Sequence, residues 1–181
     1  MHLKREPNEL DLMVGRFAKE LEEDDIKYAV VAGYVAVALG RPRTTEDVDF
    51  IVVLDDAEKL RKVMGRAGFE SLTDLNEFYT TSARFYLPPK ILPNIEVKKA
   101  KTSHHFYAVE NRIRLSICGK VEFYIGPLEH QIAYKLYLGS PKDLEDAYFI
   151  WEATKDLLEW GLIEQWAKEL GVEDRLWYLK E

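Results

Sequence analysis

Two carboxylates one residue apart give this 181-residue sequence its clearest chemical signal. Asp47 and Asp49 stand where a basic loop, residues 41–46, runs into an apolar segment, residues 48–53. Because side chains of a strand alternate between its faces, both carboxylates are expected on one face. Such a close pair repels unless a cation or a basic neighbour lies beside it. Mg²⁺ or Mn²⁺ suits carboxylates and fills its other positions with phosphate and water, so the pair predicts a metal site for a phosphate-bearing ligand.

A strand and a short helix precede this pair. Residues 28–33 have the pattern of a buried strand that ends at Gly33, and residues 34–40 that of a short helix closed by Gly40. Backbone N–H groups at the start of that helix, at Gly33 and Tyr34, would be able to bind a phosphate. The order is therefore strand, glycine, helix, basic loop and Asp-x-Asp strand.

This order resembles the signature of the DNA-polymerase-beta-like nucleotidyltransferase superfamily, in which a Gly-Gly or Gly-Ser pair precedes a helix, a loop and Asp-x-Asp. Arg43, Thr45, Asp47 and Asp49 match the Arg-x-Thr-x-Asp-x-Asp form of small nucleotidyltransferases from abortive-infection and toxin–antitoxin systems. The sequence departs from the family at Ala32, where the first glycine usually stands. The added methyl group restricts how closely a triphosphate approaches. The resemblance spans residues 27–150.

The resemblance implies roles for residues further along the chain. Glu96, between Ile95 and Val97, takes the place of the family's third metal-side carboxylate on a neighbouring strand. Lys98, on the same face, would meet a phosphate or neutralise Glu96. The candidate set is Asp47, Asp49, Glu96, Lys135 and Asp143 for catalysis, the first three of these for the metal, and Gly33, Tyr34, Arg43, Thr45 and Lys98 for the nucleotide.

A second, weaker part of the resemblance covers the helices after residue 127. The family has a Lys-Leu pair in one helix and a Lys-Asp start to the next, which match Lys135 and Asp143. By that resemblance Lys135 would contact the nucleotide phosphates and Asp143 would help to position the site. Helix-start rules alone also place Asp143, because Ser140 is a typical N-cap and an acid three residues later completes a capping box.

The implied activity is Mg²⁺-dependent transfer of a nucleoside monophosphate from a nucleoside triphosphate. The acceptor would be an RNA 3′ end, such as that of a tRNA, or a hydroxyl group of a protein, in a toxin–antitoxin or defence setting with a cognate partner. The alternative is a catalytically weakened member of the fold that acts as an antitoxin or protein-binding partner. Ala32 and Glu96 favour this alternative, and the intact Asp-x-Asp argues against it.

Each candidate also has a structural explanation. Asp47 and Asp49 could cap the loop or pair with Arg41 and Arg43. Glu96 and Lys98 could be an ordinary exposed strand pair. Gly33 could be a packing glycine, and Lys135 a plain surface lysine.

The remaining pattern predicts an α/β or α+β fold, with a mixed central sheet flanked by helices and a helical C-terminal region. Residues 69–82 give mixed signals and are assigned to a loop with a helical turn near 75–79. The other predicted elements are helices 8–23, 55–68, 128–138 and from 141 onward, and strands 83–87, 94–100, 112–118 and 121–125. We assign residues 1–126 to the sheet core and 127–181 to a helical region packed on it, as one compact unit.

Composition sets outer limits on function. The chain is 47% hydrophobic and 31% charged with a net charge of −7, which is typical of a globular protein and argues against a nucleic-acid-coating one. No apolar run is long enough to cross a membrane and no signal-like start is present, so a cytoplasmic location is expected. The lone Cys118 rules out an internal disulfide. The four histidines lack metal-ligand spacing and are expected to be solvated or capping residues.

Overall fold

The structure, a computed structural model, describes residues 1–180 and is built on one eight-stranded sheet. The order of strands across the sheet is β1-β7-β8-β2-β3-β6-β5-β4. Their bounds are β1 His2–Leu3, β2 Tyr28–Val31, β3 Asp47–Val52, β4 Glu70–Ser71, β5 Ala83–Leu87, β6 Lys90–Lys99, β7 Ile113–Ile117 and β8 Val121–Ile125. Central strand β3 runs antiparallel to β2 and parallel to β6, so the sheet is mixed, as predicted.

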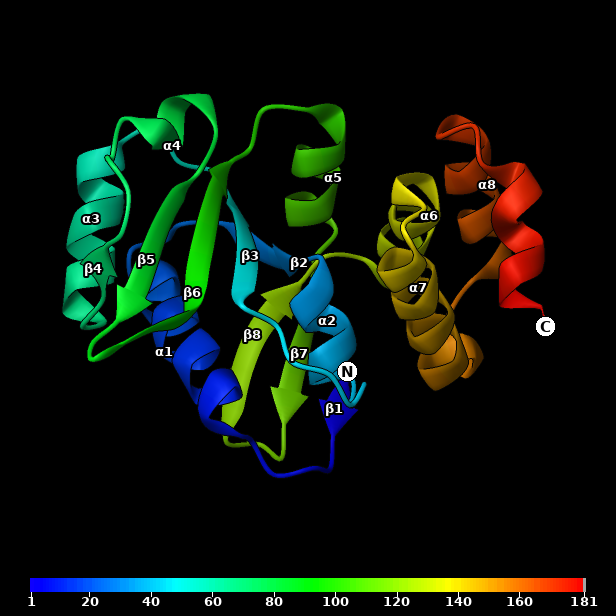
Figure 1. Ribbon diagram of the computed structural model, residues 1–181, viewed down its shortest axis with the longest axis horizontal. Helices are drawn as coiled ribbons and strands as arrows, with labels where there is room; N and C mark the ends of the chain where they lie inside the picture. The colour runs from blue at the N-terminus through cyan, green and yellow to red at the C-terminus, as the bar shows by residue number, and fades with distance from the viewer. Residues whose placement is uncertain (181) are drawn as a thin grey trace.

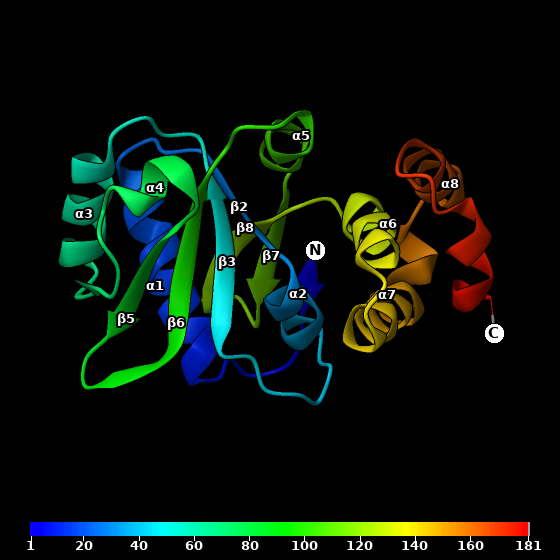
Figure 2. The ribbon, with the colours of Figure 1, turned by 45° about the horizontal axis from the view of Figure 1, so that its top comes forward.

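Helices cover both faces of the sheet and form a separate layer beside it (Figure 1). Their bounds are α1 Glu9–Glu23, α2 Gly33–Ala38, α3 Ala57–Arg66, α4 Glu77–Thr80, α5 Ser103–Glu110, α6 Leu128–Leu138, α7 Pro141–Thr154 and α8 Trp160–Glu169, with 3₁₀ turns η1 Lys155–Leu157 and η2 Glu173–Leu179. Figure 2 shows α1 and α3 behind the sheet, α5 on its other side, and α6, α7 and α8 grouped at one end. Each helix of residues 1–180 is too short or too polar to span a bilayer.

The two faces of β3 do different work. Val48, Phe50 and Val52 are fully buried in the main core, where the Phe50 ring lies 4.7 Å from that of Phe17 on α1. On the opposite face, Ile51 packs in a small cluster with residues of α5, while Asp47 and Asp49 are only partly buried. The predicted alternation is therefore confirmed, and the apolar face fixes which way the two carboxylates point.

Several elements were not predicted. Helix α5 was missed, although Thr102 caps it by accepting a hydrogen bond from the His105 N–H, because its short sequence has no clear apolar stripe. Strand β1 was also missed. Strand β6 begins at Lys90 rather than at residue 94, and it tolerates Pro93 because pairing with β3 begins only at Asn94. Strand β4 occupies part of the segment assigned to a loop, whereas the short helix α4 overlaps the helical turn predicted near residues 75–79.

The turn between β2 and α2 carries an alanine in a glycine-like conformation. Ala32 has φ +61° and ψ −139°, a region that favours residues without a Cβ. The glycine that the resembling family usually has at this place would adopt that conformation without strain. Ala32 therefore affects the turn in two ways. Its backbone adopts a strained conformation, and its methyl group occupies space that a glycine would leave open.

Replacing Ala32 by glycine should raise the free energy of unfolding by about 1 kcal/mol, because relief of backbone strain exceeds the entropy that glycine gains in the unfolded chain. Chemical denaturation measures the change. Ala36→Gly is the matched control, since Ala36 lies in α2 and should lose about 1 kcal/mol or more. Equal destabilisation by both variants would show that the turn at position 32 is not strained.

Candidate functional site

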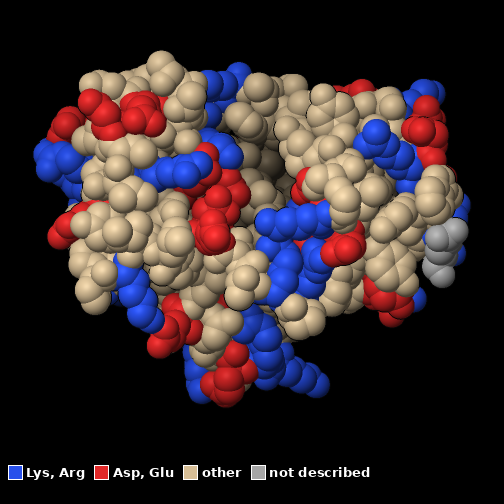
Figure 3. All heavy atoms as spheres, in the orientation of Figure 1, with Lys and Arg blue, Asp and Glu red and all other residues tan. Residues whose placement is uncertain are grey.

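A cleft of about 660 Å³ lies between the polar face of the sheet and the helical layer. In the space-filling view it is a hollow with acidic side chains on one side and basic side chains on the other (Figure 3). Most of the candidate residues line it, namely Gly33, Thr45, Asp47, Asp49, Lys98, Lys135 and Asp143. Arg43, Tyr34 and Glu96 do not line it directly. The fold therefore brings most of the predicted site together from β3, β6, α6 and α7.

The wall formed by the sheet is a charged group built by strand register. Asp49 on β3 stands directly opposite Glu96 on β6, and Lys98 follows two residues later on the same face. The Lys98 ammonium donates to Asp49 Oδ1 at 2.8 Å and lies 3.4 Å from Glu96 Oε1. Burial raises the pKa of Asp49, Lys98 opposes that rise, and the negative charges of Glu96 and Asp47 add to it. This pocket therefore favours a cation beside Asp49.

The Glu96 side chain is buried, in contrast to the exposed strand pair that was one explanation of its sequence pattern. It is 8% exposed and accepts hydrogen bonds from Ser82 Oγ at 2.7 Å and Arg84 Nη2 at 3.3 Å. Burial alone would raise the pKa of Glu96. The bond from Ser82 and the charges of Lys98 and Arg84 outweigh burial, so the pKa lies below its usual value. Glu96 is a paired, buried anion and not an ordinary exposed strand residue.

In residues 1–180 no group of three or more His, Cys, Asp or Glu side chains is arranged to hold a metal ion. The predicted metal ligands therefore do not form a three-carboxylate site here. The Lys98 ammonium lies between two of them, Asp49 and Glu96. The pair Asp47 and Asp49 still fits Mg²⁺, which takes one or two protein carboxylates and completes its shell with substrate phosphates and water. The donor chemistry fits the ion with two protein ligands and does not require the third.

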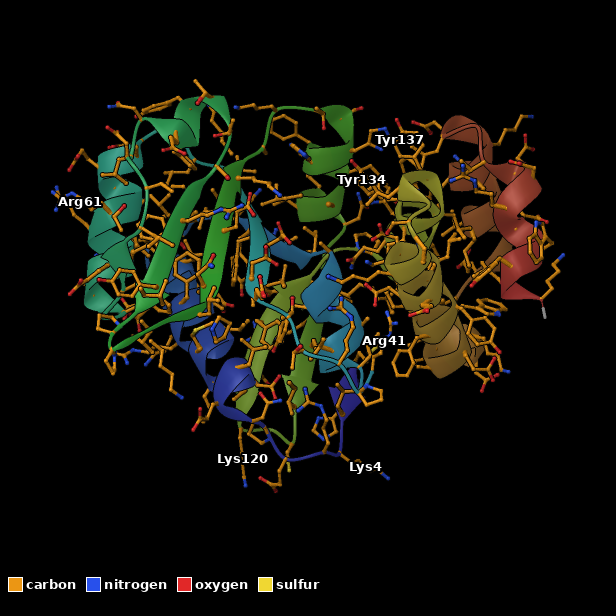
Figure 4. All side chains as sticks on the ribbon, viewed as in Figure 1. Lys4, Arg41, Arg61, Lys120, Tyr134 and Tyr137 are labelled. Carbon is orange, nitrogen blue, oxygen red and sulfur yellow. The ribbon has the colours of Figure 1, made fainter. Side chains whose placement is uncertain are left out.

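The opposite wall is organised by one buried carboxylate. Asp146 on α7 is fully buried and accepts from three cations, Arg41, Arg43 and Lys135, which come from the loop before β3 and from α6. Arg43 reaches it with Nε at 3.0 Å and Nη2 at 2.9 Å, and Lys135 Nζ at 2.7 Å. Figure 4 shows Arg41 where the sheet part meets the helical layer. Asp146 was not among the predicted residues, although it follows Asp143 on the same helix face.

The pairing of these cations corrects two structural expectations. Arg43 binds Asp146 and the Gly33 carbonyl, 3.0 Å away, and not Asp47. Lys135 is 4% exposed, so it is not a plain surface lysine. Burial tends to raise the pKa of Asp146, but hydrogen bonds from Arg43 and Lys135 lower it more, and the carboxylate stays charged. Gly33 has a packing reason of its own, because a Cβ there would lie 2.5 Å from Arg43 Nη2.

Two predicted nucleotide contacts have other partners. Tyr34 is 1% exposed and donates its hydroxyl to Asp11 on α1 at 2.6 Å, so its side chain does not face the cleft. Thr45 does line the cleft, and its hydroxyl donates to the Asp47 carbonyl at 2.9 Å. That bond holds the loop immediately before the paired carboxylates.

Asp143 combines a capping and a cleft position. Its backbone N–H donates to Ser140 Oγ at 3.2 Å, which confirms Ser140 as the N-cap of α7. Its carboxylate accepts from the Ser140 hydroxyl, at 2.5 Å, instead of from the backbone N–H that a capping box predicts. The Lys135 ammonium lies 3.4 Å from the same carboxylate. Asp143 therefore links the start of α7 to the lysine of α6.

Histidines form an unexpected part of the cleft. His130 on α6 is 6% exposed, and its Nε2 lies 3.1 Å from Nδ1 of His104 on α5. Trp166 of α8 packs edge-on against the His130 ring at 4.7 Å. Burial, with smaller contributions from His104 and His105, lowers the pKa of His130 to about 4. The expectation of solvated histidines is wrong for His130, because the missed helix α5 brings His104 against α6.

Solved structures with the same fold are nucleotidyltransferases or resemble them. An antigenic nucleotidyltransferase-like protein from Paracoccidioides brasiliensis matches with a TM-score of 0.62 and 21% identity, over 95% of this chain and 92% of that one. The antibiotic-resistance factor ANT(2'')-Ia matches at 0.62 and 11% identity, over 94% and 95%. The lincosamide antibiotic adenylyltransferase LnuA, with lincomycin bound, matches at 0.56 and 11%, over 83% and 100%. The chain therefore has the nucleotidyltransferase fold, as predicted.

No protein-family model matches the sequence, and no curated protein matches it significantly. At these low identities, the likeness to solved structures establishes the fold alone.

Replacing Asp146 by asparagine should lower the free energy of unfolding by about 3 to 5 kcal/mol, because it leaves three largely buried cations without their shared anion. The matched control is Glu145→Gln. Glu145 is exposed, and within residues 1–180 its one ion pair is with Arg41, so its loss should cost less than about 1 kcal/mol. Chemical denaturation of both variants measures the difference. Similar, small losses would contradict a central structural role for Asp146.

The lowered pKa of His130 predicts a loss of stability in acid. The His130 ring binds a proton near pH 6.5 in the unfolded chain but only near pH 4 in the folded protein. Stability from the neutral ring is therefore present above pH 6.5 and declines towards pH 4, by up to about 3 kcal/mol. His130→Phe should reduce this decline, measured by denaturation between pH 7 and 4.5. His2→Gln, at the exposed end of β1, should leave it intact. An unchanged slope in His130→Phe would contradict the assignment.

Proposed function

We propose that this protein transfers a nucleoside monophosphate from a nucleoside triphosphate to a hydroxyl acceptor. The observation that carries the proposal is that Asp47 and Asp49 lie on one face of β3 and line the cleft. The facing wall contributes Lys135, held in place by Asp146. Paired carboxylates opposite fixed cations suit a polyphosphate bound together with a divalent metal.

Asp47 and Asp49 would hold Mg²⁺ or Mn²⁺, which when bound offsets phosphate charge and activates a hydroxyl group. The protein's own cations would do the rest of the electrostatic work. The Lys98 side chain is 38% exposed and lines the cleft, so its ammonium, which Asp49 and Glu96 share, would meet a phosphate oxygen. Lys135 and the exposed Lys142, which also lines the cleft, would contact the rest of the polyphosphate.

Other predicted residues would act by position. Arg43 would fix the Gly33 turn through its carbonyl, so that the turn presents its backbone to the ligand. Glu96 would keep Lys98 charged and beside Asp49, since Asp49 and Glu96 together hold the pKa of Lys98 above its usual value against the opposing effect of burial. Asp143 would orient Lys135 from the start of α7. Direct activation of the acceptor by Glu96 would require that carboxylate to exchange its present partners.

We propose that the acceptor is an RNA 3′ end, such as that of a tRNA, or a protein hydroxyl, in a cytoplasmic toxin–antitoxin or defence setting. The support is the resemblance of the Arg-x-Thr-x-Asp-x-Asp segment to that of small nucleotidyltransferases from abortive-infection and toxin–antitoxin systems. A small-molecule hydroxyl is a further class, since ANT(2'')-Ia was solved with adenylyl-2″-tobramycin. Labelled nucleoside triphosphates incubated with total RNA, cell protein and hydroxylated small molecules would show which fraction becomes labelled.

A binding role without catalysis is the second candidate. The strained Ala32 turn and the enclosure of Glu96 favour it. In that case the protein would act as an antitoxin or as the partner of another protein. Metal-dependent nucleotide binding without transfer to any acceptor would favour this candidate.

Nucleoside triphosphate with Mg²⁺ should raise the melting temperature, because the ligand binds only the folded state. The gain is about 2.7 kcal/mol at one hundred times the dissociation constant. Asp47→Asn combined with Asp49→Asn should abolish that gain without unfolding the protein, since it removes close like charges. Asp55→Asn is the control, because Asp55 is exposed and its one ion pair in the described part of the chain is with Lys99. A wild-type response in the double variant would place the site elsewhere.

A further inference from the structure

We propose that Tyr134 and Tyr137 on α6 form a stacking surface for a nucleobase. The inference rests on the proposed function, since it assigns the ring of the nucleotide to a part of the same cleft. The two tyrosines are three residues apart and share a face of the helix. Both line the cleft, yet 39% and 50% of their surfaces stay exposed, as does 51% of Leu138 beside them. Figure 4 shows them at one end of α6, with Tyr134 on the side towards α5.

The Tyr134 ring is held in place from behind. It stacks on His130 with ring centres 6.1 Å apart and planes 27° from parallel, and His130 stacks in turn on His104 at 5.4 Å and 22°. The Trp166 ring packs edge-on against His130 and adds a further contact to this group of rings. A ring that is already ordered loses little freedom when a ligand stacks on it, so the surface is preorganised for a flat partner.

The chemistry of the whole cleft identifies that partner. One wall carries Asp47, Asp49 and Lys98, which suit a metal-bound phosphate, and the other carries exposed aromatic rings. Between Tyr134 and Leu138 the only charged residue is Lys135, whose ammonium is turned to Asp146. A polycation would find no free carboxylate on this segment. A ligand with an anionic end and a flat apolar end fits both walls, and a nucleotide has that composition.

Stacking uses the face of a base and not its hydrogen-bonding edge, so the surface would accept different bases. The base could come from the nucleoside triphosphate or from the last nucleotide of an acceptor strand. The two sources share one chemistry, and binding measurements separate them.

Calorimetry would compare binding of ATP and inorganic tripolyphosphate, each with Mg²⁺, to the wild-type protein and its variants. Tyr134→Leu and Tyr137→Leu should weaken ATP binding by about 5- to 150-fold, the range typical of removing an aromatic stacking partner, and leave tripolyphosphate binding unchanged. Tyr134→Phe should keep most of the affinity that Tyr134→Leu loses. Tyr148→Leu is the matched control, because Tyr148 is 37% exposed on α7 and does not line the cleft.

A second arm uses a short single-stranded RNA with and without its 3′-terminal base. If the leucine variants weaken only the strand that keeps this base, the surface binds the base of the acceptor. If they weaken ATP, it binds the base of the donor, and either result supports the proposal. Unchanged affinity for every base-containing ligand would overturn it, as would equal weakening of tripolyphosphate.

The oligomeric state is measured on the same samples. If the leucine variants convert a wild-type dimer into a monomer, the surface is an interface between copies, and the proposal fails. If the wild-type protein binds neither ATP nor tripolyphosphate, the proposed function fails and this inference fails with it. Binding of both, with no effect of the tyrosines, overturns the inference alone.

Discussion

A buried carboxylate ties the loop before β3 to the helices beside the sheet, which also share one apolar core with it. Asp146 on α7 has no solvent exposure, and it neutralises Arg41 and Arg43 from the loop before β3 together with Lys135 from α6. A buried anion is stable only when it is fully paired, so the loop and both helices must adopt one arrangement. That arrangement holds the loop before β3 against α6 and α7, which line the cleft. The ion pairs of Asp146 therefore both place charged side chains beside the cleft and hold the elements that carry them together.

A second constraint comes from strand register. Because β3 and β6 run parallel with Asp49 opposite Glu96, the alternation of side chains places Lys98 on the same polar face. The apolar face of β3 is locked into the core by Phe50, which leaves the polar face no freedom to turn away. The sheet thus presents acids and a lysine to the cleft as a fixed wall. The helical layer presents cations and aromatic rings opposite to it.

Local pattern was sufficient to predict much of this architecture. Alternation in β3, the Ser140 cap and the bounds of the helix over residues 128–138 follow from local sequence rules, and each is present. What failed depended on contacts far apart in sequence. The pairing of Arg43 with Asp146 joins residues separated by 103 positions, and the His104 and His130 contact needs helix α5, which has no strong apolar stripe. The hydrogen bond from the Tyr34 hydroxyl to Asp11 on α1, which joins residues 23 positions apart, was not predicted either.

A crystal structure with a non-hydrolysable nucleoside triphosphate and Mg²⁺ tests the central claim most directly. The account predicts density for the ligand in the cleft between β3 and α6, with its phosphates between the Asp47 and Asp49 pair and Lys135. Its base would lie towards the tyrosines of α6, and Asp146 would keep its three cations. A ligand bound outside this cleft, or bound in it with no contact to the paired carboxylates through metal or water, would contradict the account.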